Sequence, residues 1–181
     1  MMKKLIQVGV LGVVSLFSTY AAADWSFPLF DFSSFSSGAA DLDSQARTLS
    51  AKAPSLNPEA LKLGLKAYHK AREQGLDNKQ LLTIVDYSKP STERRLYVFD
   101  MKQNNVLFHE YVAHGKNSGD NLPTSFSNSP SSLKSSLGVY VTRQPYVGSH
   151  GYSLRINGLE KGINDMAARR AIVVHAASYV G

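Results

Sequence analysis

The sequence predicts one mostly β (α+β) domain that follows an export signal and a flexible segment. Short runs rich in β-branched and aromatic residues recur from about residue 81 onward, separated by Gly-, Ser- and Pro-containing loops. One long amphipathic helix pattern precedes them, and the length beyond the signal suits one domain of average size. The 181 residues contain no cysteine, so stability has to come from a hydrophobic core rather than from disulfides.

Residues 1–23 have the pattern of a Sec-type signal peptide. Lys3 and Lys4 precede the apolar run 5–17, and three alanines at 21–23 supply small residues for cleavage. We therefore expect cleavage after Ala23, a periplasmic or secreted protein, and no stable membrane span afterwards. Removal of this segment leaves 18 basic and 14 acidic residues, a net charge of +4. This charge suits an anionic partner such as cell-wall polymer, and no basic and aromatic cluster indicates nucleic acid.

Two segments separate the signal from the strands. Residues 24–54 are rich in Ser, Ala and Phe and predict a flexible segment with a short helix around residues 42–49. A longer helix follows, for which Asn57 is the expected N-cap, Pro58 the first residue and Gly75 the stop. Its apolar face is expected to pack on the sheet and comprises Leu61, Leu65, Tyr68 and Ala71.

The remaining sequence predicts strands joined by polar loops. Glycine- and serine-rich stretches at 114–120 and 124–132 are long enough to be either functional or disordered loops. A short helical turn is expected near 164–170. The expected strands cover residues 82–87, 95–100, 106–112, 137–142, 152–157 and 171–175.

His175 follows the apolar run Ala171–Val174, so it is expected where a buried strand leaves the sheet. A histidine in such a place can transfer protons near neutral pH. It can equally complete the hydrogen bonds of a strand end. The residues of this segment alone leave both interpretations open.

Two motifs resemble catalytic signatures but lack the required spacing or context. His109 and His114 are separated by an odd number of positions, so a strand would point them to opposite faces, and a metal site is not expected. Ser131 and Lys134 match a Ser-x-x-Lys pattern, but no Lys-Thr-Gly segment accompanies them. No other serine stands in a recognisable nucleophile turn. We expect no metal and no cofactor.

Seven segments of the chain match one family in order, namely 84–98, 112–119, 124–128, 135–140, 150–155, 158–162 and 170–175. In these segments the chain resembles the murein L,D-transpeptidase catalytic domain family, the exported branch of the YkuD-like group. The resemblance implies a β-sandwich or barrel-type domain over residues 55–181. It implies a cysteine acyl transferase that acts on peptidoglycan stem peptides, and it matches His175 to the histidine that takes the thiol proton.

The chain departs from the family at the nucleophile. The family's cysteine lies in a Gly-Cys motif beyond the histidine, whereas this sequence has no cysteine and Ser178 is a poor substitute. We therefore expect a catalytic domain that is incomplete at its C-terminus, lacks the oxyanion-hole amides and is inactive as given. One alternative is a naturally short, non-catalytic module that binds murein or a protein partner. A Ser-x-x-Lys serine enzyme is a remote alternative.

Five further residues are candidates for substrate contacts because they lie in glycine-flanked segments expected near His175. Arg155 could pair with a carboxylate of the stem peptide. Support of the fold is an equally good interpretation for each residue. The candidates are His114, Ser118, Tyr140, Tyr152 and Arg155.

Overall fold

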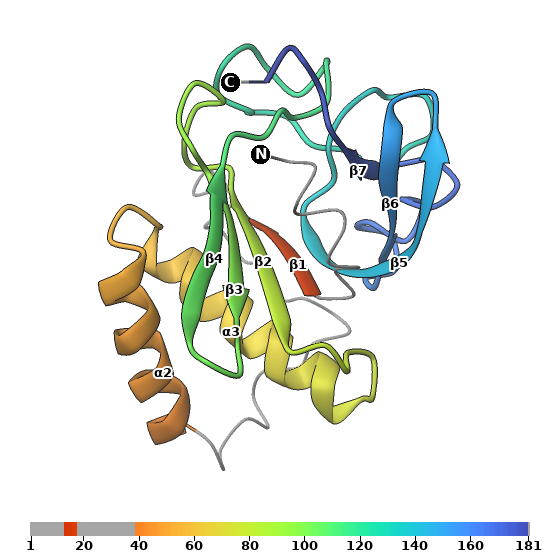
Figure 1. The fold of residues 1–181 in the computed structure, drawn as a ribbon. Coiled ribbons are helices and arrows are strands. Elements are labelled where there is room, and N and C mark those ends of the chain that lie inside the picture. The colour runs from red at the N-terminus through yellow and green to blue at the C-terminus, as the bar shows by residue number, and fades with distance from the viewer. Residues whose placement is uncertain (1–12, 18–38, 181) are drawn as a thin grey trace.

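The computed structural model describes residues 13–17 and 39–180, which form two helices and one seven-stranded sheet in the order β4-β3-β2-β1-β5-β6-β7 (Figure 1). The helices are α2 (Ala39–Lys52) and α3 (Pro58–Glu73). The strands are β1 (Val13–Phe17), β2 (Leu81–Asp86), β3 (Leu96–Asp100), β4 (Asn105–Glu110), β5 (Gly138–Gly148), β6 (Gly151–Gly158) and β7 (Val173–His175).

The sheet consists of two antiparallel groups that β1 joins. Strands β2, β3 and β4 form one group, and β5, β6 and β7 form the other. Strand β1 runs parallel to β2 and antiparallel to β5, so it closes the gap between the groups. This arrangement confirms the mostly β, α+β class that the sequence predicts, and the expected strands lie within a few residues of the observed ones.

Helix α3 forms where its capping residues and apolar spacing predict it. The Asn57 side-chain oxygen accepts the backbone N–H of Glu59 at 2.9 Å, which satisfies one of the free donors of the first turn. Lys70 and Arg72 in the last turn suit the negative end of the helix dipole. All four residues predicted for the apolar face are buried, namely Leu61, Leu65, Tyr68 and Ala71.

Helix α2 lies inside the segment 24–54, for which we expected flexibility and a short helix. Residues 39–52 form a regular helix, because Leu42 and Leu49 fall on one face and are buried in the core shared with α3. Gln45 also binds His69 of α3 at 2.8 Å and Asn104 at 2.8 Å, which ties α2 to its neighbours. Residues 24–38 lie outside the described part of the chain.

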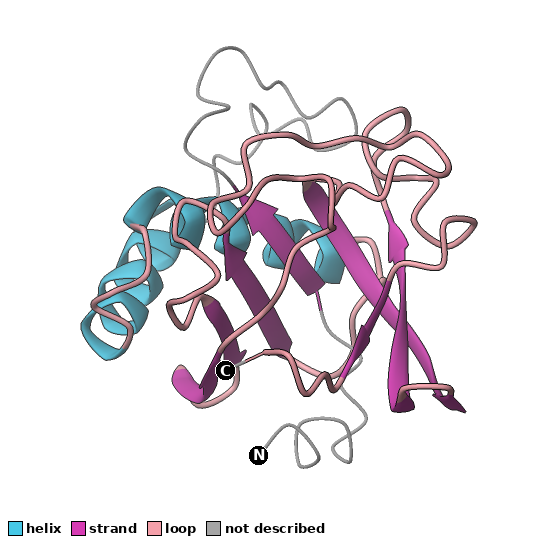
Figure 2. Ribbon diagram, turned by 90° about the horizontal axis from the view of Figure 1, so that it is seen from above, coloured by secondary structure: helices cyan, strands magenta, loops and turns pink. Residues whose placement is uncertain are grey.

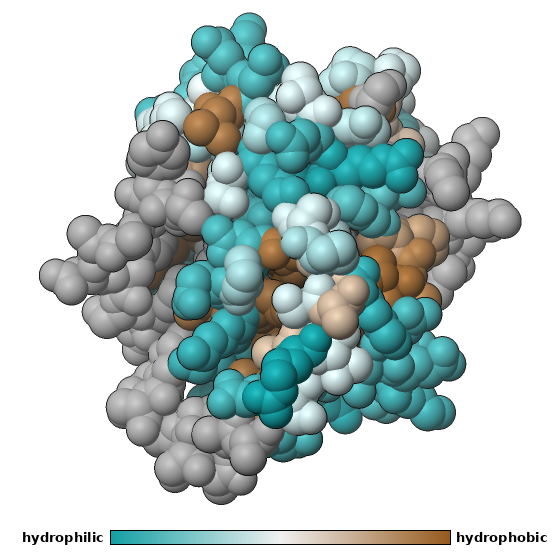
Figure 3. Space-filling view, turned by 90° about the vertical axis from the view of Figure 1, so that its left-hand side faces the viewer, coloured by the Kyte–Doolittle hydropathy of each residue, from teal (hydrophilic) through white to brown (hydrophobic). Residues whose placement is uncertain are grey.

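Both helices lie on one side of the sheet, and the long loops run over the opposite side (Figure 2). The core under the helices includes Leu82 and Ile84 of β2, whereas Val85 packs in a second cluster with Tyr140 and Ile156. On the side seen in Figure 3, apolar side chains show only in patches between hydrophilic ones. Because the helices cover the other side, the loop side of the sheet is the side available to a ligand.

The segment 161–171 differs from the expected short helical turn. It is a series of turns, and the carbonyl of Glu160 accepts the N–H groups of Ile163, Asn164 and Asp165. Because one carbonyl serves three amides, the segment closes into a compact loop rather than a helix. It delivers the chain to β7.

Strand β1 coincides with part of the expected signal peptide. The cleavage site after Ala23 and most of residues 1–23 lie outside the described residues, so the signal peptide stays a prediction. Within the described residues, neither helix combines the length and the apolar character needed to cross a bilayer.

Candidate functional site

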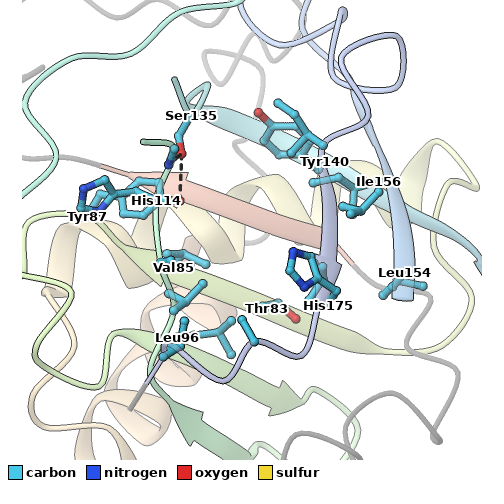
Figure 4. A pocket seen from close by; sticks show the side chains of 18 of the residues that line it. Thr83, Val85, Tyr87, Leu96, His114, Ser135, Tyr140, Leu154, Ile156 and His175 are labelled. Atoms are coloured by element: carbon cyan, nitrogen blue, oxygen red, sulfur yellow. Dashed lines mark hydrogen bonds between the residues drawn. The ribbon is translucent and has the colours of Figure 1, made fainter. Parts of the chain in front are cut away.

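A cavity of about 360 Å³ lies on the loop side of the sheet, between the two strand groups (Figure 4). Thr83 and Val85 of β2 line it from one group, and Tyr140 of β5 and His175 of β7 line it from the other. Its walls are mainly apolar and include Leu96, Leu154, Ile156 and Val174. An apolar cavity with few polar groups is the usual form of a small-ligand site.

His175 presents one ring nitrogen without a partner at this cavity. Its Nδ1 lies 2.9 Å from the carbonyl oxygen of Ala176, and a carbonyl only accepts, so Nδ1 carries the proton. Within residues 13–17 and 39–180, no hydrogen bond to Nε2 is formed. A neutral imidazole held through Nδ1–H has Nε2 ready to accept a proton, which is the arrangement that a general base requires.

His114 lines the opposite side of the cavity and has a different hydrogen-bonding state. Its Nδ1 lies 2.8 Å from Nη2 of Arg95, which only donates, so Nδ1 is the acceptor. Its Nε2–H then donates to the carbonyl of Gly119 at 3.1 Å. Both ring nitrogens are used, so His114 holds the loop 114–119 in place and is not available as a base.

Arg95 holds together the segments that form the His114 side of the site. Its side chain is buried and donates to the carbonyls of Lys89 and Val112 at 2.8 and 2.9 Å, besides His114. The guanidinium also lies 4.9 Å from the centre of the Tyr87 ring. Burial lowers the pKa of Arg95, yet an arginine stays charged in this setting. Sequence reasoning missed this residue, because an arginine before an apolar strand gives no sign of its burial.

The serine-rich loop closes the upper wall of the cavity through close backbone contacts. The Ser135 hydroxyl accepts the N–H of Gly115 at 2.9 Å, and the N–H of Ser135 donates to the Ser118 hydroxyl at 2.9 Å. A side chain at position 115 would meet the backbone of residues 133–135, so glycine permits this approach. The loops 114–119 and 131–136 therefore pack as one unit.

Arg170 joins this loop to the segment before β7. Its guanidinium donates to the carbonyl of Ser127 at 2.7 Å, and to the hydroxyls of Ser136 at 2.6 Å and Ser132 at 3.0 Å. It also donates to the carbonyl of Lys134. These bonds fix the loop relative to the strand that carries His175. The sequence contained no signal for this role beyond a basic residue next to a strand.

The structure separates the five predicted substrate residues. His114 and Tyr140 line the cavity with His175, whereas Ser118, Tyr152 and Arg155 do not. The Tyr140 hydroxyl donates to the carbonyl of Ser136 at 2.9 Å, and burial raises its pKa above the ordinary value. Ser118 is fully buried in the loop contact described above.

Tyr152 and Arg155 lie on β6 outside the cavity. Tyr152 is 40% exposed, and the Arg155 guanidinium lies 4.4 Å from the centre of the Tyr146 ring. A cation over an aromatic ring on the neighbouring strand stabilises the β5–β6 hairpin. A contact of these residues with substrate stays a prediction.

The Ser-x-x-Lys motif is not assembled. Lys134 donates to the Ser125 hydroxyl at 2.6 Å, while Ser131 is exposed and has a positive φ of 59°. His109 stacks on Tyr97 and contacts the Arg94 carbonyl, away from His114. In the described parts of the chain, no three His, Asp or Glu side chains are grouped so that they could hold a metal ion.

A second, more open cavity of about 740 Å³ adjoins the first. The two share His114 and Tyr179, and the second is lined by polar residues that include Lys116 and Asp120. The site therefore has an apolar part next to His175 and a polar part beyond His114.

Comparison with protein families gives one match, described as an L,D-transpeptidase catalytic domain, over residues 52–181. The chain belongs to the L,D-transpeptidase catalytic domain family. The matched range contains both cavities and His175, and it starts at the end of α2. No curated protein and no solved structure matches the chain. Membership indicates L,D-transpeptidase-like chemistry on peptidoglycan, and the 181 residues contain no cysteine.

Proposed function

We propose that this L,D-transpeptidase-like domain acts in acyl transfer on peptidoglycan stem peptides, with His175 as the general base. The observation that carries the proposal is the Nε2 of His175, which lies at an apolar cavity and has no hydrogen bond to any described residue, while Nδ1–H is held on the carbonyl of Ala176. In the proposed reaction, Nε2 takes the proton of a thiol as the sulfur attacks the carbonyl of an L-residue joined to a D-residue. The same proton then goes to the departing amine.

The shape of the site supports a peptide substrate. The cavity of about 360 Å³ next to His175 suits the apolar part of a stem peptide, such as alanine side chains. The polar cavity beyond His114 has Lys116 and Asp120 on its walls, which suit the charged groups of a stem. A bound stem peptide would thus extend across both cavities.

The nucleophile does not come from residues 1–181, because they contain no cysteine. We propose that these residues supply the base and the substrate site only, and that on their own they form no thioester. Incubation with a disaccharide-tetrapeptide should therefore release no D-amino acid, as measured by mass spectrometry. Release of D-amino acid by this chain would contradict the cysteine mechanism.

Binding of a stem peptide can be measured without turnover. In histidine NMR spectra of the full chain, a disaccharide-tetrapeptide should shift the imidazole signals of His175 and His114. His69 and His109 do not line the cavities and serve as internal controls. Equal shifts of His175, His114, His69 and His109, or no shift at saturating ligand, would refute the assignment of the site.

The same pocket without a cysteine also suits a non-catalytic module that binds murein. Both functions predict retention on purified sacculi, so the coding sequence past codon 181 separates them. An in-frame Gly-Cys motif supports the transferase, and an immediate stop codon supports the binding module.

We also propose that the protein is exported to the periplasm or beyond. The basic and apolar pattern of residues 1–23 supports this localisation. N-terminal sequencing of protein from fractionated cells should find Asp24 as the first residue. A cytosolic protein that retains Met1 would contradict the proposal.

A further inference from the structure

His150 makes a contact that neither the core nor the cavity explains. It is an exposed residue in the turn between β5 and β6, and its ring stacks on the ring of His175. The ring centres are 4.4 Å apart and the ring planes differ by 20°. Aromatic rings at this separation and tilt attract each other.

The turn that holds His150 is well defined. Gly148 and Gly151 pair across the hairpin, so only residues 149 and 150 form its tip. Gly151 has a φ of +77°, a conformation that favours glycine. The hairpin therefore fixes the backbone of His150 at the end of β6, the strand that pairs with β7.

His175 needs such a contact because its own anchors are few. It is the last residue of the three-residue strand β7, and among the described residues its imidazole makes one hydrogen bond, to the carbonyl of Ala176. One bond to a ring nitrogen leaves the imidazole able to turn about χ2, a torsion with a broad preference. A second ring lying parallel to it restricts this rotation.

We propose that His150 is a positioning residue for His175. Its ring covers one face of the His175 imidazole and holds the plane in which Nδ1–H reaches the Ala176 carbonyl. Nε2 then stays unbonded at the cavity in most molecules. The value of this arrangement for catalysis rests on the proposed function, whereas the stacking itself does not.

The test measures which nitrogen of His175 carries the proton. Long-range ¹H–¹⁵N NMR spectra of the full chain, at a pH where the imidazoles are neutral, should show His175 mainly as the Nδ1–H form. His150→Ala should increase the population of the Nε2–H form, or of His175 rings rotated about χ2, by about two- to tenfold, the effect expected for loss of one aromatic pair. His150→Phe keeps a ring at this position and should restore the wild-type spectrum.

Val147→Ala is the matched control, because Val147 lies on the same hairpin and is 79% exposed. It should leave the His175 signals unchanged. The proposal is overturned if His150→Ala keeps the wild-type distribution, or if His150→Phe behaves as His150→Ala. If the wild-type chain binds no stem peptide but His150→Ala still changes the proton distribution of His175, the proposed function is refuted and the stacking proposal stands.

Discussion

Because the Glu160 carboxyl is buried, we predict that the domain loses stability as the pH rises through neutrality. The carboxyl group is fully buried, and Oε2 accepts the N–H of Val139 at 2.7 Å and the amide of Asn164 at 3.2 Å. Among the described residues, Oε1 has no hydrogen-bond partner. Burial raises the pKa of Glu160 from 4.5 to about 7, against the smaller opposite effect of the two hydrogen bonds.

The direction and size of the effect follow from this shift. Between pH 4.5 and about 7 the folded chain keeps a proton on Glu160 that the unfolded chain releases, so stability falls as the pH rises. The contribution is fully present below pH 4.5 and is lost above about pH 7. At 1.36 kcal/mol per pKa unit, the loss amounts to about 3 kcal/mol.

Glu160→Gln separates this residue from all other titrating groups. Glutamine keeps the acceptor for Val139 and Asn164 and cannot titrate, and the remaining groups cancel in the difference between the two proteins. Urea unfolding followed by circular dichroism should show wild type losing about 3 kcal/mol relative to the variant between pH 4.5 and pH 8. A difference that does not change with pH would refute the reasoning.

Three further substitutions test the supports of the fold and the site by urea unfolding. Gly138→Ala places a Cβ against the Glu160 carboxyl at a φ of +111° and should lower the free energy of unfolding by about 2–4 kcal/mol. A loss as small as that of a typical exposed substitution would contradict this prediction. Arg95→Lys removes the guanidinium that binds two carbonyls and His114 and should lower the free energy of unfolding by about 2–4 kcal/mol. An unchanged free energy of unfolding would contradict a need for the guanidinium geometry, because the lysine ammonium would then be sufficient. Asn57→Ala should lower the free energy of unfolding by about 1 kcal/mol, and Asn57→Asp should keep it near the wild-type value. An equal loss in both variants would contradict a stabilising role of the cap.

The local elements could be predicted because each has a periodic or capping signal in its own residues. Helix α3 has its cap, its proline and its apolar face within one stretch, and strands β2 and β3 consist mostly of apolar residues. Helix α2 was expected only as a short helix in a flexible segment. Its buried face depends on contacts with α3, and such contacts between elements are not visible in a local pattern.

The site could be predicted only in part, for the same physical reason. His175 follows an apolar strand, so its place at the sheet could be expected, and the family resemblance gave it a role. Arg95, Arg170 and His150 act through contacts with residues distant in the sequence. Nothing in their own neighbourhoods distinguishes them from solvated surface residues.

The site exists because two antiparallel groups of strands are held side by side. Thr83 and Tyr140 reach the cavity from different groups, and β1 is the strand that joins these groups through pairing with both β2 and β5. Backbone groups of a central strand are bonded on both sides, so β2 and β5 depend on β1 for their inner hydrogen bonds. Val13–Phe17 also lies in the predicted signal peptide. Cleavage after Ala23 would thus remove the strand that pairs with both β2 and β5. The two groups would then be joined through the loop contacts of Ser135 with Gly115 and of Arg170 with Ser136.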